Sequence, residues 1–160
     1  MDIVFVSGIA WAIAQFIKII LRYIHIKKLD LKLLWGSGGF PSAHSAFVTC
    51  LMLQIGFVEG FKTSLFALAL GFWAVVIYDS FNVRYAVGLQ GKAINDLAKE
   101  IADGQGKNYS PLKEVLGHTP TQVAAGVLLG GLIAMMRISF IPFTMRIIYT
   151  LNIFYRGVAS

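Results

Sequence analysis

The sequence predicts an all-α integral membrane protein. We expect a single domain, residues 1–160, built as a polytopic membrane helix bundle of about five spans with one cytoplasmic amphipathic helix. Hydrophobic residues make up 57% of the chain and charged residues only 14%, whereas a soluble domain carries about 25% charged residues. The apolar residues gather into runs of helical length, and the basic residues lie between those runs. The bilayer is therefore the expected solvent.

Five apolar runs account for the expected spans. They cover residues 3–21, 42–58, 63–78, 121–136 and 138–155. Several are at the short end of the roughly 17–25 residues that a spanning helix needs, so flanking residues must extend them. The first run is not read as a signal peptide, because Asp2 replaces the basic segment and no small-residue cleavage site follows. The fifth run is interrupted by Pro142 and Arg146, and it either spans the membrane or lies at the interface.

A long polar stretch, residues 82–117, separates the third run from the fourth. Within it, apolar side chains recur at helical spacing at Ala93, Ile94, Leu97, Ala98, Ile101 and Ala102. Charged and amide side chains occupy the other face, so the pattern predicts a short amphipathic helix. We expect this helix to lie against the membrane surface or over the bundle, and to end at residues 103–106.

Positive charge in the connections predicts the orientation. The first connection contains Arg22, Lys27, Lys28 and Lys32, the third contains Arg84, Lys92, Lys99, Lys107 and Lys113, and the second and fourth contain only Lys62 and Arg137. The positive-inside rule places the first and third connections in the cytoplasm and the N-terminus outside. The net charge of +6 favours anionic membrane lipid or a phosphorylated lipid substrate as partner, and no nucleic acid is expected. The single cysteine, Cys50, excludes an internal disulfide.

Two histidine motifs open the second and fourth runs. The first is Pro41-Ser42-Ala43-His44, and the second is Gly117-His118-Thr119-Pro120. Unpaired N–H groups and the helix dipole make a helix N-terminus a phosphate-binding site. Both motifs adjoin basic connections, so we expect them to meet at the cytoplasmic face. The three histidines lack the spacing with carboxylates or cysteine that is typical of a metal site, and neither metal nor cofactor is expected.

Four blocks of residues carry a family resemblance. They are Ala14-Gln15 with Lys18, then residues 38–46, then Tyr78-Asp79-Ser80 through Arg84 with Gly88 and Gln90, and lastly Leu112-Lys113-Glu114 through Gly126. In this order they resemble the divergent branch of the type 2 phosphatidic acid phosphatase superfamily, which is related to acid phosphatases and vanadium-dependent haloperoxidases. The resemblance implies a metal-independent lipid phosphate phosphohydrolase. We expect it in a bacterial plasma membrane, with its active site facing the cytoplasm.

The resemblance also implies roles for individual residues. His118 matches the nucleophile that forms a phosphohistidine, and His44 matches the general acid that protonates the leaving oxygen. A neutral imidazole is a competent nucleophile and its protonated form can donate, so both residue types suit this chemistry. Ser42 is expected to hydrogen-bond a phosphate oxygen. The candidate phosphate-binding cations are Lys18, Arg22, Arg84 and Lys113.

The third motif departs from that of the better-known enzymes. Gln122 stands where they have aspartate; four residues after His118, it should reach the imidazole and fix its tautomer, but it cannot stabilise an imidazolium by charge. The Lys-x6-Arg-Pro motif is absent, and Asp79 and Arg84 are candidates for the vacant roles. Structural alternatives remain: Ser42 as a helix N-cap, Lys18 extending to the membrane surface, and an Asp79–Arg84 salt bridge. Close helix packing is the expected role of Gly126, Gly130 and Gly131.

Two functions from different classes fit these observations. The first is a membrane phosphatase that hydrolyses a lipid or isoprenoid phosphate through a phosphohistidine at the cytoplasmic face. The alternative is a catalytically silent relative that binds or transports a phosphorylated lipid, in which the same cations form a headgroup site. Release of phosphate from a panel of lipid phosphates distinguishes the two.

Overall fold

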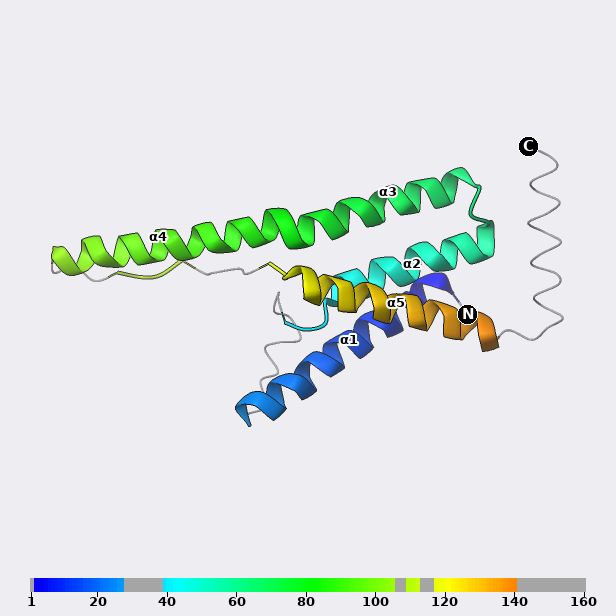
Figure 1. Cartoon of the computed structure of the whole chain (residues 1–160), viewed down its shortest axis with the longest axis horizontal. Helices are drawn as coiled ribbons and strands as arrows, with labels where there is room; N and C mark the ends of the chain where they lie inside the picture. Colours follow the sequence, from blue (N-terminus) through cyan, green and yellow to red (C-terminus); the bar gives the residue numbers. More distant parts are fainter. Residues whose placement is uncertain (1, 28–38, 106–108, 113–116, 141–160) are drawn as a thin grey trace.

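The computed structural model describes residues 2–27, 39–105, 109–112 and 117–140, and this part of the chain is all-helical. Its elements are α1 (Ile3–Ile26), α2 (Ala43–Glu59), α3 (Ser64–Tyr78), the π-helix η2 (Asp79–Val83), α4 (Arg84–Gly104) and α5 (Pro120–Phe140). Helices α1, α2 and α5 pack together, and α3, η2 and α4 form one long helix that extends past them (Figure 1). The predicted all-α class is confirmed.

The first four apolar runs are helices, as predicted, but two of them end later than expected. α1 continues to Ile26, so that Arg22 and His25 lie on the helix instead of in a loop. α5 continues through Arg137 to Phe140, and the rest of the expected fifth run, residues 141–155, lies outside the described residues. In the described part, three helices are long and apolar enough to cross a membrane and α2 is a shorter apolar helix. The expected number of about five spans is therefore not confirmed.

α2 is the central helix, in contact with α1, α3 and α5. The side chains buried between α1, α2 and α5 are mostly small and include Ala10, Ala14, Ala43, Ala46, Cys50 and Ala134. Helices in a bilayer associate through close van der Waals packing, because lipid offers no hydrophobic driving force between them. Small side chains at these positions let the helix backbones approach.

Two glycines bring α5 against α2. A Cβ atom on Gly126 would lie 2.3 Å from the carbonyl oxygen of Ser42, and one on Gly130 would lie 2.3 Å from that of Ala46. No other residue fits at either position without separating the helices. The predicted role in close packing is confirmed for these two. It does not extend to Gly131, where the nearest atom, on Leu53, would be 3.9 Å away.

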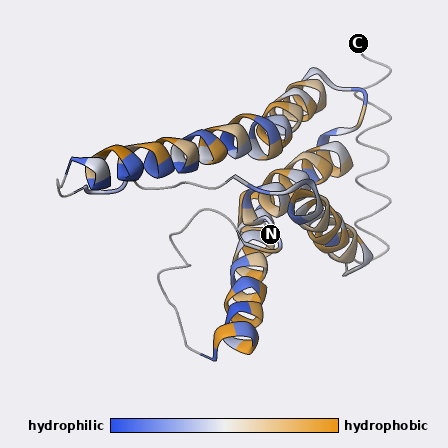
Figure 2. Ribbon diagram, turned by 60° about the vertical axis from the view of Figure 1, so that its left-hand side comes forward, coloured by the Kyte–Doolittle hydropathy of each residue, from blue (hydrophilic) through white to orange (hydrophobic). Residues whose placement is uncertain are grey.

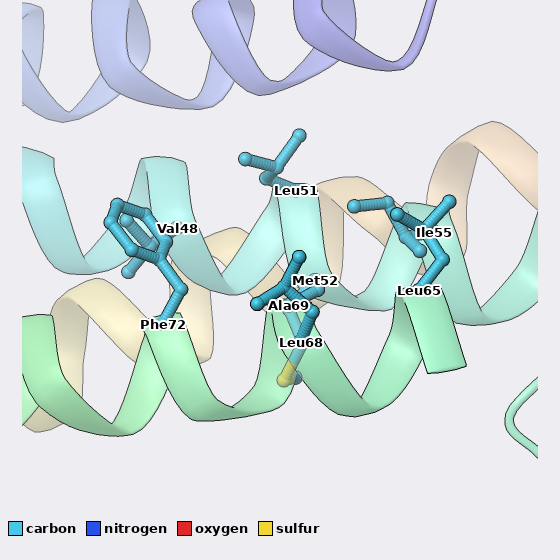
Figure 3. Close-up of a pocket in the computed structure, with 8 residues that line it drawn as sticks. All are labelled: Val48, Leu51, Met52, Ile55, Leu65, Leu68, Ala69 and Phe72. Carbon is cyan, nitrogen blue, oxygen red and sulfur yellow. The ribbon is translucent and has the colours of Figure 1, made fainter. Parts of the chain in front are cut away.

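α3 packs against α2 through one polar contact and an apolar groove. The Trp73 indole Nε1–H donates to the Thr49 hydroxyl at 2.8 Å. The groove between the two helices holds a cavity of about 200 Å³ (Figure 3), lined by Val48, Leu51, Met52, Ile55, Leu65, Leu68, Ala69 and Phe72. No residue of α3 is buried, as expected for a helix whose outer face meets lipid.

The amphipathic helix is confirmed, but it does not lie over the bundle. α4 continues α3 through the π-helix and projects beyond the other helices (Figure 1). Leu112, which follows α4 in the chain, is bonded back to it. Asn95 of α4 accepts from the Leu112 N–H at 2.8 Å and donates to the Leu112 carbonyl at 2.9 Å. The Tyr109 hydroxyl donates to the same amide oxygen. The predicted end of the helix agrees with its last residue, Gly104.

A buried polar contact explains why α5 does not stop at Arg137. The guanidinium Nη1 donates to Oε1 of Gln54, an α2 side chain that is fully buried. An ionisable group inside a membrane bundle is stable only where polar partners meet it. This contact lies at the end of the bundle opposite the two histidines, because α2 and α5 both run from a histidine motif toward it.

Candidate functional site

The amino end of α2 meets the first turn of α5. Ser42 is the N-cap of α2: its Oγ accepts from the backbone N–H of Ser45 at 3.3 Å and from the Ser45 hydroxyl at 2.8 Å. Its own backbone N–H donates to the carbonyl of Gln122 at 3.0 Å. The N-cap interpretation is therefore confirmed. The Ser42 hydroxyl hydrogen is still available as a donor, since both side-chain bonds use the oxygen as acceptor. His44 follows in the first turn and is exposed.

His118 lies just before α5 and is held by the π-helix. Its backbone N–H donates to the carbonyl of Ser80 at 3.1 Å. The preceding Gly117 touches the main chain of the long helix, where a Cβ would lie 2.3 Å from the Tyr85 nitrogen. A π-helix inside an α-helix often marks a functional site. Here it fixes the backbone of a histidine that is itself only 5% exposed.

The Gln122 side chain determines the tautomer of His118. Its Oε1 accepts from the Thr119 backbone N–H at 3.2 Å, which identifies that atom as the carbonyl oxygen and not the amide nitrogen. The same oxygen lies 3.1 Å from Nδ1 of His118. Since an oxygen can only accept, Nδ1 must carry the hydrogen. In the neutral tautomer that this contact favours, the lone pair is on Nε2, whereas a further hydrogen bond to the Gly39 backbone favours the protonated ring.

Burial lowers the pKa of His118 below its ordinary value of about 6.5. The charges of Lys18 and of His44 lower this pKa further, whereas hydrogen bonds to Gln122 and to the Gly39 backbone raise it. Burial is the largest influence. A lowered pKa favours the neutral imidazole at pH 7.

Lys18 is buried at this junction, only 5% exposed, and does not extend to the membrane surface. Its aliphatic chain lies against Gly39, where a Cβ would be 2.8 Å from Lys18 Cδ. Gly39 also has a φ of 86°, a conformation that side chains disfavour. The close approach of glycine to lysine directs a buried cation toward the two histidines, with both of which it interacts electrostatically.

Asp79 and Arg84 form the ion pair that the sequence allowed as a structural alternative. Arg84 Nε donates to an Asp79 carboxylate oxygen at 2.6 Å, and both side chains are exposed or half-exposed. Such a pair contributes about 0–1 kcal/mol to stability. Arg84 also interacts electrostatically with His44, so its charge lies near the site. Asp79 pairs with an arginine in this structure, and the described contacts give it no imidazole partner.

The remaining predicted cations are not brought into the described site. Arg22 is exposed on α1, one turn beyond Lys18. Lys113 lies outside the described residues. The structure also gives a role to three positions that the sequence named only within motifs. Gly39 lies against Lys18, the Ser80 carbonyl accepts from His118, and Gly117 lies against the main chain of the long helix. The glycines at or near the two histidine motifs could have indicated the contacts of Gly39 and Gly117, since glycine permits close backbone approach.

The fold and the site define an all-helical integral membrane protein with two histidines and a buried lysine gathered at the amino ends of two apolar helices. Residues 1–133 match the Divergent PAP2 family, and the chain belongs to this family. It is similar to the Uncharacterized membrane protein YuiD of Bacillus subtilis (strain 168), with 36% identity over 134 residues, or 77% of this chain and 85% of that protein. No solved structure matches the chain.

Proposed function

We propose that this protein is a membrane phosphatase that hydrolyses a lipid or isoprenoid phosphate through a phosphohistidine intermediate at the cytoplasmic face. The observation that carries the proposal is the contact between His118 Nδ1 and Gln122 Oε1, because it leaves Nε2 with its lone pair. A neutral, oriented imidazole beside a buried cation is the arrangement that nucleophilic attack on phosphorus requires. Membership of the Divergent PAP2 family supports a phosphatase-related role.

In the proposed reaction, His118 Nε2 attacks phosphorus, forming the P–N bond while the bond to the ester oxygen breaks. His44, as the imidazolium, gives its proton to the departing oxygen. The neutral His44 then removes a proton from water as the water oxygen attacks the phosphohistidine and releases inorganic phosphate. Lys18, Arg84 and the Ser42 hydroxyl hold the phosphate oxygens and offset the developing charge.

The test is phosphate release by the purified protein in lipid discs from a panel of lipid and isoprenoid phosphates. We expect release that survives chelator, is inhibited by vanadate and falls at least 100-fold in His118→Ala. His25→Ala, an exposed change on α1, is the matched control and keeps full activity. His44→Ala should lose least with acidic leaving groups, which need no proton; equal losses for good and poor leaving groups contradict its role as acid.

A second function is favoured by one observation, the neutral amide at Gln122. Without a carboxylate behind the imidazole, the charge of an imidazolium is not stabilised. A catalytically silent protein that binds or transports a phosphorylated lipid would have the same cations and no turnover. Saturable binding of a fluorescent lipid phosphate that is lost in Lys18→Met, with no phosphate released from any substrate, supports this alternative and contradicts the first.

A further inference from the structure

The helix that projects from the bundle has an exposed apolar stripe. It consists of Val83, Val87, Ile94, Leu97 and Ile101, whose exposed fractions are 51%, 53%, 53%, 59% and 53%. In Figure 2, hydrophilic and hydrophobic residues alternate around α4, whereas the bundle helices are mainly hydrophobic. Side chains of this size are rarely left exposed in a row on a soluble surface.

Counted along the helix from Ser64, the stripe from Val87 onward lies beyond the roughly 30 Å of one hydrocarbon core. The helix from Ser64 to Gly104 has 41 residues and is about 60 Å long at 1.5 Å per residue, twice the roughly 30 Å of the hydrocarbon core. The apolar face of α3 meets lipid and needs no protein partner. α4 begins at the Asp79–Arg84 ion pair and carries further charged residues to its end, which favours an aqueous environment for its apolar stripe.

The spacing of the stripe is that of a coiled coil. Its positions alternate by four and three residues, with Val87, Ile94 and Ile101 at a and Val83, Gln90 and Leu97 at d of a heptad repeat. β-Branched residues at a with leucine at d favour two parallel strands, and a polar residue in the seam fixes the register. We propose that α4 forms a parallel two-stranded coiled coil with α4 of a second copy of this chain.

The surroundings of the stripe suit this partner. Of the described residues that follow α4, Tyr109 and Leu112 bond to Asn95, which is not part of the stripe. The residues flanking the stripe are mostly small: Ala86, Gly91, Ala93 and Ala98. Two helices can therefore approach closely. Copies inserted in one membrane share one orientation, so a two-fold axis along the membrane normal makes their α4 helices parallel.

Disulfide formation in native membranes tests the proposal. In a parallel coiled coil, cysteines at equivalent a positions face one another within disulfide reach. After mild oxidation we expect at least tenfold more covalent dimer from Ile94→Cys and Val87→Cys than from Lys92→Cys, the matched control on the outer face. The native Cys50 is buried in the bundle, so the unmodified chain should give no dimer.

A second measurement keeps the test decisive. The double variant Ile94→Asp with Leu97→Asp should be a monomer by light scattering in detergent, and Lys92→Asp should stay a dimer. Equal disulfide formation at 94 and 92 overturns the proposal. The proposal is also overturned if the Ile94→Cys protein is a monomer and its cysteine does not react with a water-soluble maleimide. That result is expected if the stripe lies against lipid. His118→Ala should leave dimer formation unchanged, which separates this inference from the proposed reaction.

Discussion

Replacing Gln122 by glutamate places a negative charge behind His118 with little change of shape. The glutamate carboxylate can accept from the same two donors as the amide, the His118 Nδ1–H at 3.1 Å and the Thr119 N–H at 3.2 Å. The geometry of the site should therefore persist. The change restores the charge that the better-known enzymes place there, so it tests directly what the amide does.

The expected effect is a higher pKa for His118. An opposite charge within about 4–6 Å raises the pKa of an imidazole by about 1–3 units, which is a stabilisation of the imidazolium by about 1.4–4 kcal/mol. In the native protein burial lowers this pKa, so the neutral, reactive form persists below about pH 6.5. The loss of phosphate release that is caused by protonation of His118 should then occur only at lower pH. In Gln122→Glu this decrease should begin at a pH about 1–3 units higher, while the rate above it is kept or raised.

The assay is kcat/KM for phosphate release as a function of pH, together with an NMR titration of the histidine ring that does not depend on turnover. Gln122→Leu is the matched control: it removes the acceptor without adding charge, and it should reduce activity by about five- to tenfold because a hydrogen bond worth about 1 kcal/mol is lost. An unchanged His118 pKa in Gln122→Glu would refute the assignment of Oε1 to Nδ1. Full activity in Gln122→Leu would refute the role of the amide in orientation.

Three further predictions follow from the packing and the charges. Gly126→Val should lower the free energy of unfolding by about 1–3 kcal/mol or more, since the new Cβ would overlap the Ser42 carbonyl. Gly131→Ala should leave the Tm unchanged. Equal losses of stability in the two variants contradict close packing at Gly126. Lys18→Met should raise KM for a lipid phosphate about tenfold or more without lowering the Tm, because a buried charge is removed along with a charge-assisted hydrogen bond to the phosphate; an unchanged KM excludes Lys18 from phosphate binding. A cysteine at Gln105 should react only with reagents that enter the cell and one at Lys62 from outside; the reverse pattern overturns the cytoplasmic assignment.

The helices could be predicted because their signals are local. The apolar runs have the length and spacing of helices, and the ends of α2 and α3 agree with the expected ones to within one residue. α1 is longer than expected because polar Arg22 and His25 are tolerated on a helix that leaves the membrane. The continuity of α3 with α4 could not be predicted, because polar residues from Asn82 onward look like a connection. The π-helix, Asp79–Val83, joins α3 to α4 without a break, and the polar residues after Asn82 lie in α4 itself.

The residue types of the candidate site could be predicted, but the backbone contacts that position them could not. Motif spacing and charge indicated that His44 and His118 meet, and the contact of Gln122 with His118 has the expected four-residue separation. The sequence left Lys18 with two interpretations, since burial depends on Gly39, which is far away in the chain. The bond from His118 to Ser80 depends on a carbonyl exposed by tertiary structure, for which no local pattern exists.

The backbone bond from Ser42 to Gln122 has a consequence for biosynthesis. The ribosome makes the chain from its N-terminus, so α2 is inserted while Gln122 has not yet been synthesised. The amino end of α2 therefore lacks this partner until α5 has entered the bilayer and Gly126 has packed against the Ser42 carbonyl. A nascent chain, however well inserted, holds no assembled site. The candidate site is assembled only when the last described helix is in place, so it forms after residues 120–140 have been translated.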